Sequence, residues 1–264
     1  MRMASKSGVV LEARNLRKAF EVPSEKLASL REIIGSGFRR IPSARLVALD
    51  DVSFEIRRGE FFGVIGNNGC GKTTLLRLLA GIYMPDSGRV SIDGSVAPLL
   101  ELGSGFNPEL SARDNILING CILGIPLPWL RLHWRKILSY AGLSRFSELK
   151  VKNYSSGMVS RLAFSIASFV DADVYLMDEV FAVGDLDFKR LCLERMESLK
   201  DSGKTVVLVT HDLASVEAHC GRAMLIDRGM VAFEGDASEC VARYKAAHGA
   251  AVSGEVRVEL EGAR

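Results

Sequence analysis

The sequence predicts an α/β fold made of a parallel-sheet core, an antiparallel β layer and an α-helical subdomain. A glycine-rich loop at Gly66–Thr74 joins a short apolar run to a helical pattern, an arrangement that binds phosphate at a helix N-terminus. In the C-terminal half, near-continuous apolar strands alternate with helices, which is typical of a buried parallel sheet. Ahead of the loop, apolar residues alternate with charged ones, as in an antiparallel layer.

The N-terminal elements are predicted to be strands interrupted by an insertion. Val9–Ala13 has the composition of a strand, and Leu46–Ile56 alternates apolar and polar residues. Residues 23–46 fit this pattern poorly, because four apolar residues recur at helical spacing before a basic loop that ends in proline. We expect an amphipathic insertion that either covers the sheet or contacts a membrane partner or its substrate. The four residues are Leu27, Leu30, Ile33 and Ile34.

The central loop follows the predicted strand Phe61–Ile65 and matches the spacing G-x-x-x-x-G-K-[ST]. Such a loop curls tightly enough for successive backbone N–H groups to face a phosphate chain. Lys72 would reach the β- and γ-phosphates, and the Thr73 hydroxyl would bind Mg²⁺. The predicted nucleotide-binding residues of the loop are Gly66, Asn67, Asn68, Gly69, Cys70, Gly71, Lys72, Thr73 and Thr74.

Beyond the loop helix, a turn at Met84–Gly88 leads into another strand of the early layer, and residues 107–165 then form the predicted helical subdomain. Helices are expected at Arg113–Ile125 and Trp129–Leu143, the second with an apolar stripe. Asn153–Leu162 begins a further helix with hydroxyl residues and a glycine, which leaves backbone N–H groups free to meet an anion.

The C-terminal half is predicted to supply the rest of the parallel sheet, and residues 1–249 are expected to form one domain followed by a loose tail at 250–264. The expected strands are Val174–Met177, Thr205–Val209 and Met224–Ile226, and the expected helices are Phe188–Ser202 and Leu213–Cys220.

Polar residues follow two of these strands at the edge where ligands of open α/β sheets bind. Asp178 is suited to the Mg²⁺ shell, and Glu179 to orienting or deprotonating an attacking water. His211 follows the next parallel strand, from which its imidazole can reach the γ-phosphate.

Composition excludes other classes of function. The chain has 34 basic and 32 acidic residues, so we expect no nucleic-acid partner. Its five cysteines include no C-x-x-C pair, which suits neither a disulfide framework nor a zinc cluster and indicates a reducing cytosol. The longest uncharged stretch, Ile116–Leu130, is short and interrupted by glycine and proline, so the chain is not expected to span a membrane by itself.

The motifs together resemble the ATP-binding-cassette (ABC) ATPases over nearly the whole chain, from Val9 to about Tyr244. The resemblance implies a P-loop NTPase fold with a RecA-like core. It also implies that Phe20 stacks on the base, that Asp178 and Glu179 form the Walker B pair, and that His211 is the switch histidine. Asp185 falls in the D-loop Val183-Gly184-Asp185. The signature loop is identified as Tyr154, Ser155, Ser156, Gly157 and Met158, where Ser156 replaces a glycine and Met158 the usual glutamine.

One position departs from the family. Most ABC ATPases have a glutamine between Walker A and the helical subdomain that contacts Mg²⁺ and couples to the membrane subunit. This chain contains no glutamine, and Glu101 or Leu102 occupies that neighbourhood.

Three stretches resemble the subfamily that exports O-antigen, teichoic acid and capsule: Leu99–Phe106, Ile226–Gly229 leading to Glu234-Gly235, and the insertion at 23–46, which in that subfamily lies near the substrate entry. This resemblance implies an ATP-hydrolysing subunit at the cytoplasmic face of the bacterial inner membrane that drives export of lipid-linked polysaccharide, most simply O-antigen. It also implies three partners: a second copy of the chain joined head to tail around ATP, two copies of a membrane permease, and the polysaccharide itself.

The alternatives are an export ATPase for teichoic acid or capsule, an ATPase that energises another transporter, a soluble ABC protein acting on the ribosome or DNA, and a non-catalytic nucleotide-binding regulator. After Tyr244 only about twenty residues remain, too few for a carbohydrate-binding sandwich domain. We therefore expect this chain not to recognise the glycan end.

Overall fold

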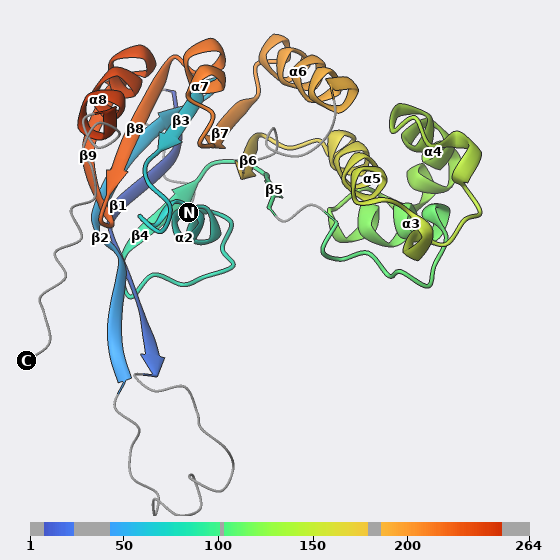
Figure 1. The fold of residues 1–264 in the computed structure, drawn as a ribbon, viewed down its shortest axis with the longest axis horizontal. Coiled ribbons are helices and arrows are strands. Elements are labelled where there is room, and N and C mark those ends of the chain that lie inside the picture. The colour runs from blue at the N-terminus through green and yellow to red at the C-terminus, as the bar shows by residue number, and fades with distance from the viewer. Residues whose placement is uncertain (1–7, 24–42, 101–102, 179–185, 250–264) are drawn as a thin grey trace, which may run out of the picture.

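The computed structural model describes residues 8–23, 43–100, 103–178 and 186–249, and two sheets organise them (Figure 1). The first sheet is antiparallel with the strand order β2-β1-β4, and the second has the order β5-β6-β7-β3-β8-β9. All neighbours in the second sheet are parallel except β8 and β9. The predicted α/β fold is confirmed. The strands are β1 Val9–Pro23, β2 Ser43–Arg57, β3 Phe61–Ile65, β4 Ser87–Ile92, β5 Val96–Leu99, β6 Val174–Asp178, β7 Thr205–Val209, β8 Arg222–Asp227 and β9 Met230–Asp236.

The six-stranded sheet is buried on both faces, which explains why its central strands are apolar throughout. Because side chains alternate along a strand, Phe62 and Val64 in β3 pack with helix α2 and the antiparallel sheet. Phe61 and Ile65 in the same strand face the second core, which contains the remaining helices. The helix α2, Lys72–Leu79, thus lies where the two sheets meet, directly after β3.

The helical subdomain lies to one side of the sheets, away from α7 and α8 (Figure 1). The Ser111 side chain caps α3 by accepting a hydrogen bond from the backbone N–H of Asp114, and Pro126 precedes α4. The observed helices begin or end a few residues away from the limits predicted from the sequence. Among the helices of the described ranges, none is long and apolar enough to cross a bilayer. The remaining helices are α3 Ala112–Ile122, α4 Leu127–Tyr140, α5 Ser156–Ser168, α6 Leu186–Asp201, α7 Leu213–His219 and α8 Ala237–Gly249, with 3-10 turns at Ser144–Phe146 and Val151–Asn153.

Strand residues extend into both ends of the segment predicted to be an insertion at about 23–46. Strand β1 continues to Pro23, and β2 already begins at Ser43, because these two residues pair across an antiparallel ribbon. Pairing with β4 ends at Arg17, so the ribbon continues past the sheet and projects from the molecule (Figure 1). The predicted amphipathic helix falls in residues 24–42 and lies outside the described residues, as do the tail at 250–264 and the pair Glu101 and Leu102.

Candidate functional site

The glycine-rich loop runs from the end of β3 to the start of α2, and two of its glycines have close backbone neighbours. A Cβ at Gly66 would lie 2.3 Å from the carbonyl oxygen of Ile226, and one at Gly71 would lie 2.4 Å from that of Ala48. Both residues have positive φ, +153° and +111°, which glycine adopts without steric cost. The loop is therefore wedged between β8 and β2.

Lys72 folds back over this loop. Its ammonium donates hydrogen bonds to the carbonyl oxygens of Gly66, at 2.7 Å, and Asn67, at 2.9 Å, and the residue is only 7% exposed. Helix α2 begins here with Gly71 as N-cap and without a side-chain cap. A cap of this kind leaves the backbone N–H groups of the first turn open to an anion, at the positive end of the helix dipole.

Within the loop, the Cys70 side chain is buried, and burial raises the pKa of its thiol, so it stays protonated at neutral pH. Its backbone is held at both ends. The N–H donates to the carbonyl of Asn67 at 3.3 Å, and the carbonyl accepts from the N–H of Gly229 at 3.1 Å. We therefore assign this cysteine a packing role in the loop.

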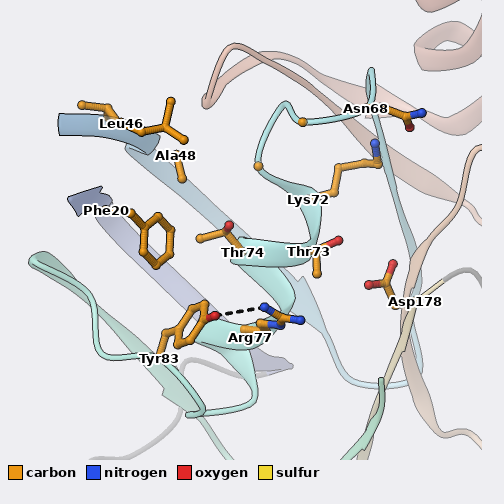
Figure 2. A pocket seen from close by; sticks show the side chains of 13 residues that line it. Phe20, Leu46, Ala48, Asn68, Lys72, Thr73, Thr74, Arg77, Tyr83 and Asp178 are labelled. Carbon is orange, nitrogen blue, oxygen red and sulfur yellow. Dashed lines mark hydrogen bonds between the residues drawn. The ribbon is translucent and has the colours of Figure 1, made fainter. Parts of the chain in front are cut away.

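A pocket of about 560 Å³ opens beside the loop (Figure 2). Of the predicted nucleotide-binding residues, those that line it are Phe20, Asn68, Gly69, Gly71, Lys72, Thr73 and Thr74, together with Asp178. Five further lining residues were not predicted from the sequence: Leu46, Val47, Ala48, Arg77 and Tyr83.

The far wall of the pocket is aromatic. Phe20 in β1 meets Tyr83 edge to face, with ring centroids 5.5 Å apart, and the Arg77 guanidinium donates to the Tyr83 hydroxyl at 2.9 Å. Phe20 is partly exposed and faces the pocket (Figure 2). Figure 2 shows Phe20 and Tyr83 on one side of the first turn of α2 and Lys72 on the other. A nucleotide whose ring bound at this wall would therefore direct its phosphates toward the loop.

The carboxyl ends of three parallel strands meet beside the loop. In the strand register, Val64 and Asp178 both pair with Val209. The loop, Asp178 and the segment after β7 therefore begin at one edge of the sheet. His211 lies two residues past β7 and is exposed, and it is not among the residues that line the pocket. Glu179 and Asp185 lie outside the described residues.

The oxygen ligands that Mg²⁺ prefers are present at this edge. The Thr73 hydroxyl and the Asp178 carboxylate both line the pocket from neighbouring elements (Figure 2). A hydroxyl and a carboxylate leave the remaining octahedral positions to water and phosphate oxygens, as Mg²⁺ usually requires. The donor set therefore fits the predicted ion.

The predicted signature loop belongs to the helical subdomain, and none of its residues lines the pocket. Ser155 is the N-cap of α5, accepting from the Met158 N–H at 3.2 Å, and Ser156 and Gly157 form the first turn. Tyr154 is buried, its hydroxyl donates to the carbonyl of Phe146 at 2.7 Å, and burial raises its pKa. The N-terminus of α5 therefore directly follows a buried, hydrogen-bonded tyrosine, and its residues Ser155 and Ser156 are exposed.

Comparison with protein families matches residues 49–182 to the model described as ABC transporter. The chain is 45% identical over 80% of its length to the O-antigen export system ATP-binding protein RfbB of Myxococcus xanthus, of which it covers 48%. It is 37% identical to RfbB of Klebsiella pneumoniae, covering 80% of this chain and 85% of that one. It is 38% identical to the teichoic acids export ATP-binding protein TagH of Bacillus cereus, and that alignment covers 87% of this chain and 40% of the TagH chain.

The chain spans about half the length of the Myxococcus relative, and 64% of the ABC transporter protein AbcA of Aeromonas salmonicida. Among solved structures, a dimeric ATP-binding cassette in a post-hydrolysis state with ADP and Pi superposes with a TM-score of 0.69 at 22% identity. That alignment covers 86% of this chain and 98% of the cassette. The glycine-rich loop, the sheet edge beside it and these matches together show that the chain belongs to the ABC transporter family of ATP-binding proteins.

Proposed function

We propose that the chain is the ATP-hydrolysing subunit of an exporter that moves a lipid-linked polysaccharide, most simply O-antigen, across the bacterial inner membrane. The observation that carries the proposal is the pocket between the aromatic wall of Phe20 and the loop around Lys72. Relatives at 37% to 46% identity carry names of O-antigen and teichoic acid export systems, or of an ABC transporter protein, which supports the class of cargo.

In this proposal the residues of the pocket bind and orient ATP. Phe20 stacks on the base, the loop amides and the Lys72 ammonium bind the phosphates, and the first turn of α2 adds its dipole. Thr73 and Asp178 would hold Mg²⁺, which neutralises charge on the phosphate oxygens. Glu179 orients the attacking water and accepts its proton, and His211 donates a hydrogen bond to the γ-phosphate.

The site is completed by a second copy of the chain. The first turn of α5, where Ser156 is exposed and Gly157 partly exposed, is a helix N-terminus suited to a phosphate. It belongs to a different part of the molecule from the pocket. A head-to-tail dimer would bring it onto the γ-phosphate of the partner's ATP, with Asp185 at the interface. Hydrolysis would then remove an anion that holds the two copies together, converting ATP turnover into movement.

We further propose two copies of a membrane permease as partners, which would hold the ATPase at the cytoplasmic face of the inner membrane. Teichoic acid or capsular polysaccharide is the alternative cargo, because the teichoic acid export relatives match this chain at about the same identity as the O-antigen export relatives of Klebsiella. A soluble ABC ATPase is the alternative of another class, and the export names of the relatives disfavour it.

A pull-down from native membranes tests the cargo and the permease. The Glu179→Gln chain, loaded with ATP so that it binds nucleotide without turnover, should retain a polytopic permease together with a lipid-linked polysaccharide, both identified by mass spectrometry. Lys72→Ala is the matched control, because it should not close on ATP and should retain less of both. Recovery of ribosomes, or of a permease for a small solute, would contradict the assignment as an exporter of polysaccharide.

ATP turnover tests the catalytic roles separately. Glu179→Gln should bind nucleotide with the affinity of the parent chain while turnover falls at least about a hundred-fold, as expected when a general base is lost. Unchanged turnover would remove Glu179 from the mechanism and favour a different base.

A further inference from the structure

A contact outside the sequence motifs joins the C-terminal helix to the glycine-rich loop. The Tyr244 hydroxyl in α8 donates a hydrogen bond to the side-chain oxygen of Asn67 at 3.0 Å, across 177 residues of sequence. Asn67 is one of the variable positions of the G-x-x-x-x-G-K-[ST] spacing. The contact is therefore a property of this chain and not of the motif.

Asn67 also accepts two hydrogen bonds from other residues of the loop. Its backbone carbonyl accepts from the Lys72 ammonium at 2.9 Å and from the Cys70 N–H at 3.3 Å. A side-chain bond that fixes Asn67 thus also fixes the acceptor that positions Lys72. Tyr244 acts on the phosphate-binding lysine through one intervening residue.

The helix that carries Tyr244 is itself anchored. Cys240 and Val241 are fully buried, and they lie four and three residues before Tyr244, on the same face of the helix. Asp236 accepts hydrogen bonds from the first-turn amides of Ser238 and Glu239. The tyrosine therefore reaches the loop from a packed helix.

A second contact ties the same helix to α7. Lys245, the residue after Tyr244, forms an ion pair with Glu217 at 3.4 Å, and α7 begins directly after the segment that contains His211. Helix α8 thus touches both the loop and the helix that follows the predicted switch histidine.

We infer that Tyr244 is a positioning residue for the phosphate-binding loop, and that it holds Asn67 and Lys72 in the arrangement that receives the phosphates of a nucleotide. This inference rests on the proposed function. A loop ordered in advance loses less conformational freedom when the ligand binds, so the tether increases affinity. Tyr244 does not line the pocket and reaches Lys72 only through Asn67, so we expect its effect to fall on nucleotide binding and not on the chemical step.

The test is Tyr244→Phe, which removes the hydroxyl and keeps the packed ring. The dissociation constant of a fluorescent ATP analogue should rise between about two-fold and about ten-fold, the range for loss of one neutral hydrogen bond. KM for ATP should rise in parallel while kcat stays at the parent value. In an Asn67→Ala background the same substitution should have a clearly smaller effect, because the side-chain oxygen that accepts from Tyr244 is already gone.

Tyr140→Phe is the matched control, since it removes a hydroxyl from a partly buried tyrosine in the helical subdomain and should leave affinity unchanged. A Tyr244→Phe chain with parent affinity, or one whose full loss persists in the Asn67→Ala background, would overturn the inference. So would a lowered melting temperature with unchanged affinity, because it would mark a purely structural role. If the parent chain itself binds no nucleotide, the proposed function fails instead.

Discussion

At the scale of single residues, the glycines of the phosphate-binding loop are distinguished by what surrounds them. A Cβ at Gly71 would meet the backbone oxygen of Ala48 at 2.4 Å and Leu49 at 2.8 Å, whereas a Cβ at Gly69 would meet nothing within 4 Å. Both have positive φ, so both substitutions carry a conformational cost, and only one adds a clash with β2.

We expect Gly71→Ala to lower the free energy of unfolding by about 3 kcal/mol or more, combining backbone strain with an overlap that β2 cannot relieve cheaply. Gly69→Ala should cost about 1 kcal/mol, from the left-handed conformation alone. Urea denaturation of the nucleotide-free chains measures both. Equal losses would show that the approach of Ala48 to the loop is not maintained in solution.

Phe20 supplies a prediction about ligand specificity. Phe20→Ala should weaken ATP binding by about 1 to 3 kcal/mol, the range for stacking of a base on an aromatic ring. Phe20→Tyr should retain most of the affinity. Binding of inorganic triphosphate, which has no base, should be the same in all three chains when measured by calorimetry. If triphosphate binding falls as much as ATP binding, the ring acts on the loop and not on the base.

The sequence was sufficient to predict the loop and, through the family resemblance, Phe20, but not the rest of the pocket walls. The loop depends on local constraints, positive φ and close approach, which only a fixed spacing of glycines satisfies. Tyr83, Leu46 and Tyr244 belong to three other segments and follow no motif. They reach the site through strand register and helix packing, which are tertiary properties that no local pattern encodes.

At the scale of elements, the helix after the predicted switch histidine depends on one carboxylate. Asp212 caps α7 by accepting from the N–H groups of Ala214 and Ser215. The Ser215 hydroxyl, and then these backbone amides, hold the pKa of Asp212 below its ordinary value. A carboxyl with a lowered folded-state pKa stabilises the fold above its unfolded pKa and loses that contribution as pH falls through the folded value.

Asp212→Ala should therefore lower the free energy of unfolding by about 1 kcal/mol at pH 7, the typical value of an N-cap. The difference from the parent chain should narrow below about pH 4, where the carboxyl becomes protonated. Asp212→Asn is the control, because it keeps a capping oxygen and loses the titration. Urea denaturation across this pH range measures all three chains, and a difference that does not vary with pH would contradict the assigned pKa shift.

Strands that are apolar throughout were predicted more accurately than strands with proline or an irregular register. Strand β3 and strand β7 match their expected limits because five consecutive buried residues leave little ambiguity. Strand β5 has four residues including Pro98 and was not predicted. The full length of β1 was not predicted either, because register shifts along its pairing with β2 interrupt the alternation of apolar and polar residues.

At the scale of the whole molecule, the proposed sharing of each site between two copies of the chain predicts complementation between defective chains. Gly157→Asp should bind ATP but not turn it over, and Lys72→Ala should do neither. The Gly157 variant should fold, because a Cβ there would meet only the Ser155 hydroxyl oxygen, at 3.9 Å.

In an equal mixture of the two variants, half of the dimers contain one of each, and such a dimer has one intact site. Turnover should recover to about a quarter of the parent value if each site acts independently in a head-to-tail pair. Each variant alone is the control. A mixture no more active than its components would contradict an active site that is shared between copies.

The ribbon of β1 and β2 holds the ends of the segment between them side by side, because Pro23 pairs with Ser43. Strand pairing therefore already brings the two ends of residues 24–42 together, and for a flexible connection each doubling of length adds only about 0.6 kcal/mol of entropic cost. Changes in the length of residues 24–42 should therefore leave Phe20 and Leu46 in their places in the pocket. The ribbon thus uncouples the length of the segment at its end from the geometry of the nucleotide pocket.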